Sequence, residues 1–210
     1  MARTITIPLD PDRFGSSQTI IASTDGLTAT GFTWPSGVCG LRLANNLGHI
    51  DLLPFQGQQI WDAEFSGRRL TMRSMFEAPQ KTTDYLANYG ALFLHCGATA
   101  MGNPSDLDTH PLHGELPNAQ YDTAQLKIGT DARGVFLALT GTSRQTAAFS
   151  HDYLARPTVR LRADDTAIEV EFECENRKHS AMDLMYLAHI NFRPVDGARL
   201  LDTVIDDTAD

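Results

Sequence analysis

The most constraining feature of the sequence is a ten-residue stretch in which apolar and acidic side chains alternate. Residues 166–175 read TAIEVEFECE. Successive side chains of an extended strand point to opposite faces, so the apolar residues share one face and the four glutamates share the other. The stretch is therefore predicted to be a strand that is buried on one face. The glutamate face is interpreted as solvated surface.

Further segments with strand character follow one another along the chain, separated by Gly, Pro, Asp and Asn. Residues 183–192 (DLMYLAHINF) come after a polar connection, and they are predicted to form an antiparallel pair with residues 166–175. Only residues 82–88 have helical character, with a threonine as a possible cap. Other strands are predicted at residues 18–22, 50–54, 58–65, 123–129, 135–141 and 158–163. This pattern predicts an all-β sandwich of antiparallel sheets with long loops.

The chain has 210 residues, no internal repeat and no linker composition, so residues 1–210 are predicted to form a single domain. Residues 95–122 contain several glycines and prolines and little periodicity, and they are predicted to form a long ordered loop. Loops longer than about 12 to 15 residues in a compact domain are usually functional or disordered. Apolar anchors within this one favour a functional loop.

Charge and cysteine content argue against several classes of protein. The formal net charge is −9, from 17 basic and 26 acidic residues, and the basic residues form no stripe that could neutralise phosphates. No apolar run approaches the roughly 20 residues of a membrane helix, and the first residues lack a signal-peptide core. We therefore expect no nucleic-acid or membrane partner and a cytoplasmic location. Three widely separated cysteines, Cys39, Cys96 and Cys174, are expected to be reduced thiols.

One end of the predicted strand 183–192 has the character of a site. His189 and Asn191 project from the same face, next to each other, where that face changes from apolar to polar. Strands present catalytic groups in this way at the rim of a binding face. The alternative is a buried histidine whose ring is satisfied by a backbone carbonyl.

The loop sequence HPLHGELPN, residues 110–118, offers a second histidine. His113 precedes Gly114, which allows a sharp turn or the close approach of a ligand. Imidazole titrates near neutrality, so one histidine can donate a proton while another orients a substrate oxygen. The predicted catalytic residues are therefore His113 and His189. Further candidates for contact with a substrate are His95, His110, Glu115, Asn191 and Trp61.

A metal site is the competing interpretation of the loop. His110, His113 and Glu115 could supply two nitrogens and an oxygen to zinc or manganese. The spacing is not a specific signature, and Pro111 restricts how both imidazoles could face one ion. Trp61 could be either a sugar-stacking platform or part of the core.

Four segments of the chain, taken in order, resemble the galactose mutarotase-like (aldose 1-epimerase) superfamily, and within it the DUF4432 branch. The segments are residues 48–70, 94–104, 111–120 and 173–194. The resemblance implies a β-supersandwich fold with a carbohydrate-binding groove and no cofactor. It also implies that His113 contacts the sugar near its reacting end, and that His189 is the acid that protonates the ring oxygen.

The chain departs from this family pattern in two ways. The family's general base is a glutamate near the C-terminus, after further strands, and no residue of this sequence matches it. We therefore expect the C-terminal strands of the family to be absent, and the exposed strand edges to favour a homo-oligomer. Glu115 stands where the branch typically has an arginine.

The leading functional hypothesis is an aldose 1-epimerase-like isomerase that interconverts sugar anomers by acid/base ring opening. A non-catalytic carbohydrate-binding module is the first alternative, because the family's base is missing. A metal-dependent sugar isomerase that uses His110, His113 and Glu115 is the second. In each case the expected partner is a small carbohydrate.

Overall fold

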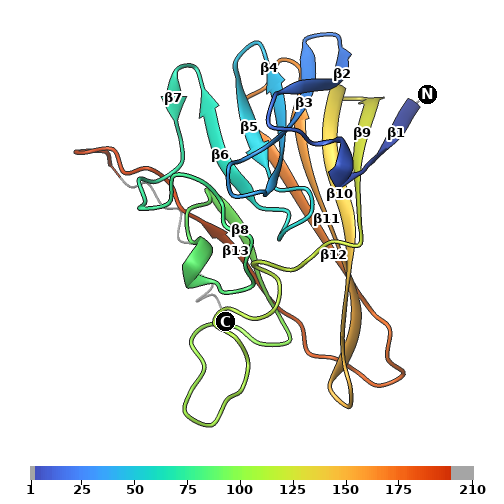
Figure 1. Cartoon of the computed structure of the whole chain (residues 1–210), viewed down its shortest axis with the longest axis vertical. Helices are drawn as coiled ribbons and strands as arrows, with labels where there is room; N and C mark the ends of the chain where they lie inside the picture. The colour runs from blue at the N-terminus through green and yellow to red at the C-terminus, as the bar shows by residue number, and fades with distance from the viewer. Residues whose placement is uncertain (1–2, 200–210) are drawn as a thin grey trace, which may run out of the picture.

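The computed structural model describes residues 3–199, which form two antiparallel sheets packed face to face (Figure 1). The first sheet has the strand order β1-β9-β10-β11-β12. Its strands are β1 (Arg3–Leu9), β9 (Thr123–Asp131), β10 (Gly134–Ala147), β11 (His151–Arg162) and β12 (Ile168–Asn176). The predicted domain of residues 1–210 extends at both ends beyond the described residues.

The second sheet has the order β13-β8-β6-β5-β4-β3-β2, and β7 pairs with β6 outside this path. Its strands are β2 (Thr19–Thr24), β3 (Leu27–Thr33), β4 (Cys39–Asn45), β5 (Gly48–Leu52), β6 (Ile60–Phe65), β7 (Arg68–Arg69), β8 (Phe93–Ala98) and β13 (Met185–Ile190). Two short 3₁₀ helices, η1 (Pro11–Arg13) and η2 (Leu86–Asn88), complete the described elements. The predicted all-β antiparallel sandwich is confirmed. No helix among residues 3–199 is long and apolar enough to cross a membrane.

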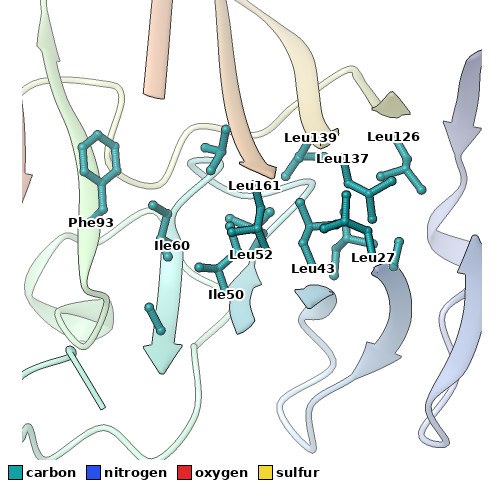
Figure 2. Packing of buried hydrophobic residues seen from close by; sticks show 14 of the residues in the cluster. Leu27, Leu43, Ile50, Leu52, Ile60, Phe93, Leu126, Leu137, Leu139 and Leu161 are labelled. Atoms are coloured by element: carbon teal, nitrogen blue, oxygen red, sulfur yellow. The ribbon is translucent and has the colours of Figure 1, made fainter. Parts of the chain in front are cut away.

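The core lies between the sheets and follows from strand alternation. Leu41 and Leu43 of β4, and Leu137 and Leu139 of β10, are fully buried and belong to one cluster that joins both sheets (Figure 2). Burying each such side chain contributes about 1.5–3 kcal/mol relative to leaving it exposed. This core fixes the faces of the strands, and therefore also fixes which side chains remain outside it.

The predicted pairing of residues 166–175 with residues 183–192 is wrong. β12 pairs with β11 in the first sheet, whereas β13 pairs with β8 in the second, so the connection crosses from one sheet to the other (Figure 1). The predicted loop also begins later than expected, because Phe93–Ala98 is strand β8. Of the predicted helical segment, only η2 forms.

Candidate active site

Strand β13 directs His189 and Asn191 away from the sandwich interior. His189 is paired with Leu94 of β8. The alternate residues Ala188 and Ile190 line a groove toward β12 instead. The strand parity predicted from the sequence is therefore confirmed, since His189 and Asn191 share the outer face.

The loop after β8 places His113 beside the edge of β8 that does not pair with β13. The amide of Gly97 donates to the carbonyl of His113 at 2.8 Å, and the amide of Leu116 donates to the carbonyl of Gly97 at 3.0 Å. His113 has a φ of 58°, a left-handed conformation that costs a non-glycine residue about 1–2 kcal/mol. Strain of this kind tends to occur at functional positions. At His113 this backbone conformation occurs at the residue whose imidazole lies beside His189.

The two histidines meet across β8 within a cluster of four rings. The ring centroids of His113 and His189 are 5.6 Å apart, with the planes at 78°. Tyr85 lies 4.9 Å from His113, and Tyr89 lies 5.7 Å from His189. We refer to Tyr85, Tyr89, His113 and His189 as the four-ring cluster. It places two imidazoles, which can each carry a proton, side by side.

The surroundings favour the neutral form of His189. Burial lowers its pKa below the ordinary value of 6.5, and the charge of nearby His113 lowers it further. The Nδ1 atoms of both imidazoles are buried and have no hydrogen-bond partner among the described residues. Burial also raises the pKa of Tyr85, which keeps that hydroxyl protonated. At neutral pH, His189 is therefore able to accept a proton.

Glu115 is held by its own chain and is not a free carboxylate at the rim. It accepts hydrogen bonds from the amides of Ala98 and Thr99, at 3.3 and 3.2 Å, and from the Thr99 hydroxyl. Burial is the largest influence on this carboxyl and acts to raise its pKa. The hydrogen bonds outweigh burial, so the pKa lies below its ordinary value. Glu115 thus anchors the loop at the end of β8, and its role as a substrate contact stays a prediction.

Asn191 lies beside the four-ring cluster, but both ends of its side chain are occupied. Its Oδ1 accepts a hydrogen bond from the Tyr89 hydroxyl at 3.0 Å, and its Nδ2 donates to the carbonyl of Ala91 at 3.0 Å. A substrate contact from this amide would require one of these bonds to break. The structure therefore gives Asn191 a supporting position.

His95, His110 and Trp61 were candidate substrate contacts, and the structure places none of them in the cluster. His95 of β8 is paired with Ala188 of β13, and both side chains lie on the interior face of the sheet. His95 is fully buried. The ring of His110 donates from Nδ1 to the Pro111 carbonyl, a local contact of 2.9 Å. Trp61 is only 5% exposed and packs against Trp34.

The loop residues His110, His113 and Glu115 do not converge on a common point, because each has a different set of neighbours. Within residues 3–199, no group of three or more His, Cys, Asp or Glu side chains is arranged to hold a metal ion. The metal-dependent alternative therefore lacks a ligand set in the described part of the chain.

Sequence reasoning missed three residues that build this site: Tyr85, Tyr89 and Asn118. Asn118 accepts hydrogen bonds at its Oδ1 from Gln59 at 3.0 Å and from Asn88 at 2.8 Å, and it is almost fully buried. The bond from Asn88 connects the loop of His113 to the segment that carries both tyrosines, and the bond from Gln59 connects the loop to the residue before β6. Local patterns offered no signal for them, because the partners are 30 or more residues apart.

Comparisons with known proteins agree with this architecture. A crystal structure of a putative aldose 1-epimerase from Klebsiella pneumoniae subsp. pneumoniae MGH 78578 superposes with a TM-score of 0.73 at 15% identity. The match covers 91% of this chain and 56% of that one, so the chain spans about half of the relative's length. No curated protein matches the chain. The family model described as "Domain of unknown function (DUF4432)" matches residues 36–202. The chain therefore belongs to the DUF4432 family and has the galactose mutarotase-like fold.

Proposed function

We propose that the protein is an aldose 1-epimerase-like isomerase that interconverts the anomers of a small sugar at His113 and His189, without a cofactor. The observation that carries the proposal is the approach of two imidazoles from separate elements to a centroid distance of 5.6 Å, with no hydrogen-bond partner for either Nδ1 atom among residues 3–199. The fold shared with a protein described as an aldose 1-epimerase supports it.

The reaction needs one proton on the pair of imidazoles. One imidazole takes the proton of the anomeric hydroxyl while the other, protonated, gives its proton to the ring oxygen, and the C1–O5 bond breaks. Rotation about the C1–C2 bond and reclosure, with the proton transfers reversed, produce the other anomer. The pair starts and ends singly protonated, so no other reagent is consumed. In this scheme histidines carry out both proton transfers.

The pH dependence follows from this requirement. A fully neutral pair has no acid, and a doubly protonated pair has no base, so the rate should follow a bell-shaped profile. Because burial and His113 lower the pKa of His189, we expect the acid limb of the profile, where the pair becomes doubly protonated, to lie below pH 6.5. Anomer exchange measured across the pH range by NMR saturation transfer checks the profile. A rate that rises steadily toward alkaline pH would contradict it.

The direct test is the exchange rate for a panel of aldoses with the wild-type protein and three variants. His189→Gln and His113→Gln should each reduce exchange by about 10²-fold or more, the usual contribution of a general acid or base. His179→Gln, at an exposed histidine in the connection before β13, is the control and should retain the wild-type rate. Exchange that survives His189→Gln, or a wild-type protein that accelerates no sugar, would overturn the proposal.

The second candidate is a non-catalytic carbohydrate-binding module. It is favoured by the described part of the chain, residues 3–199, where burial and His113 shift the pKa of His189 and no carboxylate contributes to the shift. Calorimetry that shows sugar binding, together with NMR that shows no exchange, would establish this alternative.

A further inference from the structure

A catalytic imidazole usually has its second ring nitrogen bonded to a carboxylate or carbonyl, which sets the orientation of the ring. His189 has no such partner at Nδ1 among residues 3–199, and that atom is buried. The orientation of the ring therefore depends on the side chains packed around it.

Tyr89 and His113 provide that packing. The ring of Tyr89 meets His189 at an interplanar angle of 87° and a centroid distance of 5.7 Å, and His113 meets it at 78° and 5.6 Å. Edge-to-face contacts at these distances are favourable, and they constrain the relative tilt of the two rings. Leu94 is the residue of β8 paired with His189.

Tyr89 is itself fixed at its far end. Its hydroxyl donates to Asn191 Oδ1 at 3.0 Å, and Asn191 Nδ2 donates to the carbonyl of Ala91 at 3.0 Å. The backbone amide of Asn191 also donates to the carbonyl of Leu92 at 2.7 Å. Asn191 is two residues from His189 on the same face of the chain, so the anchor and the histidine belong to one continuous backbone segment.

We propose that Tyr89, anchored by Asn191, is a positioning residue that orients the His189 ring by edge-to-face packing in place of the usual hydrogen bond. This role rests on the proposed function, because the orientation of the His189 ring serves the proposed acid/base step. The titratable groups that face His189 are His113, from the loop, and Tyr89, from the segment after η2. Removing the Tyr89 ring would expose His189 to water.

Two variants of Tyr89 separate the ring from its anchor. Tyr89→Leu removes the ring, and we expect kcat to fall by about tenfold or more, because misplacing a reacting group is costly. KM should stay within about twofold, because ground-state contacts to the sugar remain. Tyr89→Phe keeps the ring but loses the bond to Asn191, so its effect should be smaller. Asn191→Ala loses the same bond and also the bond to the Ala91 carbonyl, so adding Tyr89→Phe to Asn191→Ala should cause no further loss.

Titration of the His189 ring by NMR gives a second readout that does not require catalysis. The His189 signal is assigned from its loss in His189→Gln. In Tyr89→Leu, the pKa of His189 should rise toward 6.5, because the burial that lowers it is reduced. Tyr186→Phe is the matched control, since this tyrosine lies on the opposite face of β13 and contacts His95. It should leave the titration of His189 unchanged.

Each outcome decides between the proposals. If the wild-type protein shows no anomer exchange, the proposed function is wrong. The titrations still show whether Tyr89 controls the environment of His189. If the pKa of His189 is the same in wild type, Tyr89→Leu and Tyr89→Phe, the positioning role is wrong. The same conclusion follows if Tyr89→Leu exchanges sugars at the wild-type kcat.

Discussion

His95 lies between the two sheets, where a histidine must stay neutral. Its ring packs against Phe93 and Phe172, and its Nδ1 is 2.7 Å from the Tyr186 hydroxyl. Phe172 belongs to β12 and Tyr186 to β13, and their rings stack with centroids 4.4 Å apart. The contact therefore joins the last strands of the two sheets. Burial lowers the pKa of His95 to about 3.

The low pKa of His95 makes stability depend on pH in a defined window. The unfolded chain takes up the proton near pH 6.5, whereas the folded chain resists protonation down to about pH 3. The unfolded state therefore binds more protons within this window. His95 should lower the free energy of unfolding by about 1.4 kcal/mol per pH unit as the pH falls below 6.5. Above pH 6.5, it makes no pH-dependent contribution.

His95→Phe should remove this pH-dependent part of the free energy of unfolding and should preserve the apolar packing. Urea unfolding at pH 6.5, 5.8 and 5.2 compares the slopes before most carboxylates titrate. The wild-type protein should lose more stability over this interval than His95→Phe does, and the exposed control His179→Gln should behave as wild type. Equal slopes for wild type and His95→Phe would mean that the ring is protonated in the folded state.

At the scale of single residues, the sequence predicts the face of a strand on which a side chain lies. It does not predict which residues far away in the sequence that side chain contacts. Strand parity placed His189 and Asn191 together, because alternation needs only the local backbone. The face of His95 was missed because the glycine that follows Cys96 made the strand resemble part of a loop. The bond between Tyr89 and Asn191 spans 102 residues, and no local pattern indicates such a contact.

At the level of elements, a buried amide network joins the loop of His113 to the segment of η2. Asn118 is its centre: its Oδ1 accepts from Gln56, Gln59 and Asn88, and its Nδ2 donates to the carbonyl of Asp84. Buried amides that lose their partners are costly, so the network specifies one arrangement of the two segments. It therefore fixes the relation between His113 and the two tyrosines.

Asn118→Ala should lower the free energy of unfolding by about 3 kcal/mol, because it leaves buried amide donors without an acceptor. Urea unfolding measures this loss. Hydrogen exchange should become faster in both connected segments, since neither is then held by the other. Asn103→Ala, at an exposed asparagine of the same loop, should change stability by less than about 0.5 kcal/mol. Equal effects of the two substitutions would show that the network contributes little.

The pairing of β12 was mispredicted because it was inferred from the short polar connection between residues 166–175 and 183–192. The sequence suggested a solvated face, but several of these carboxylates pair with arginines of the neighbouring strand β11. Arg160 and Arg162 both contact Glu169, at 2.7 and 2.6 Å. Hydrogen bonding from Arg162 is the main cause that lowers the pKa of Glu169 to about 2. Alternation identified the strand correctly, but its partner depended on charges that lie earlier in the chain.

On the scale of the whole molecule, β12 and β13 contact each other through the stacked rings of Phe172 and Tyr186, but they belong to different hydrogen-bonded sheets. β12 ends the first sheet and β13 ends the second (Figure 1). A groove of about 520 Å³ lies between them. Apolar side chains from both strands line it, among them Val170 and Ile190. Alternating patterns predicted the sandwich, yet they contain no information on which strand ends each sheet. This groove therefore became visible only in the structure.

Among residues 3–199 no strand pairs with the outer edge of β13, and this edge should make the chain associate with itself. The strand has no charged residue, and its apolar side chains are exposed, with Met185 at 44% and Ile190 at 47%. Exposed apolar edges are templates for pairing with another strand, and a lysine on the edge opposes such pairing. Sedimentation of the wild-type protein should therefore depend on concentration, and Ile190→Lys should abolish that dependence. Ile20→Lys is the matched control, because Ile20 is 65% exposed on β2, at the opposite edge of the same sheet. Ile20→Lys should leave the association intact. Equal behaviour of the two variants would contradict pairing through β13. A wild-type protein that stays monomeric at high concentration would contradict it as well.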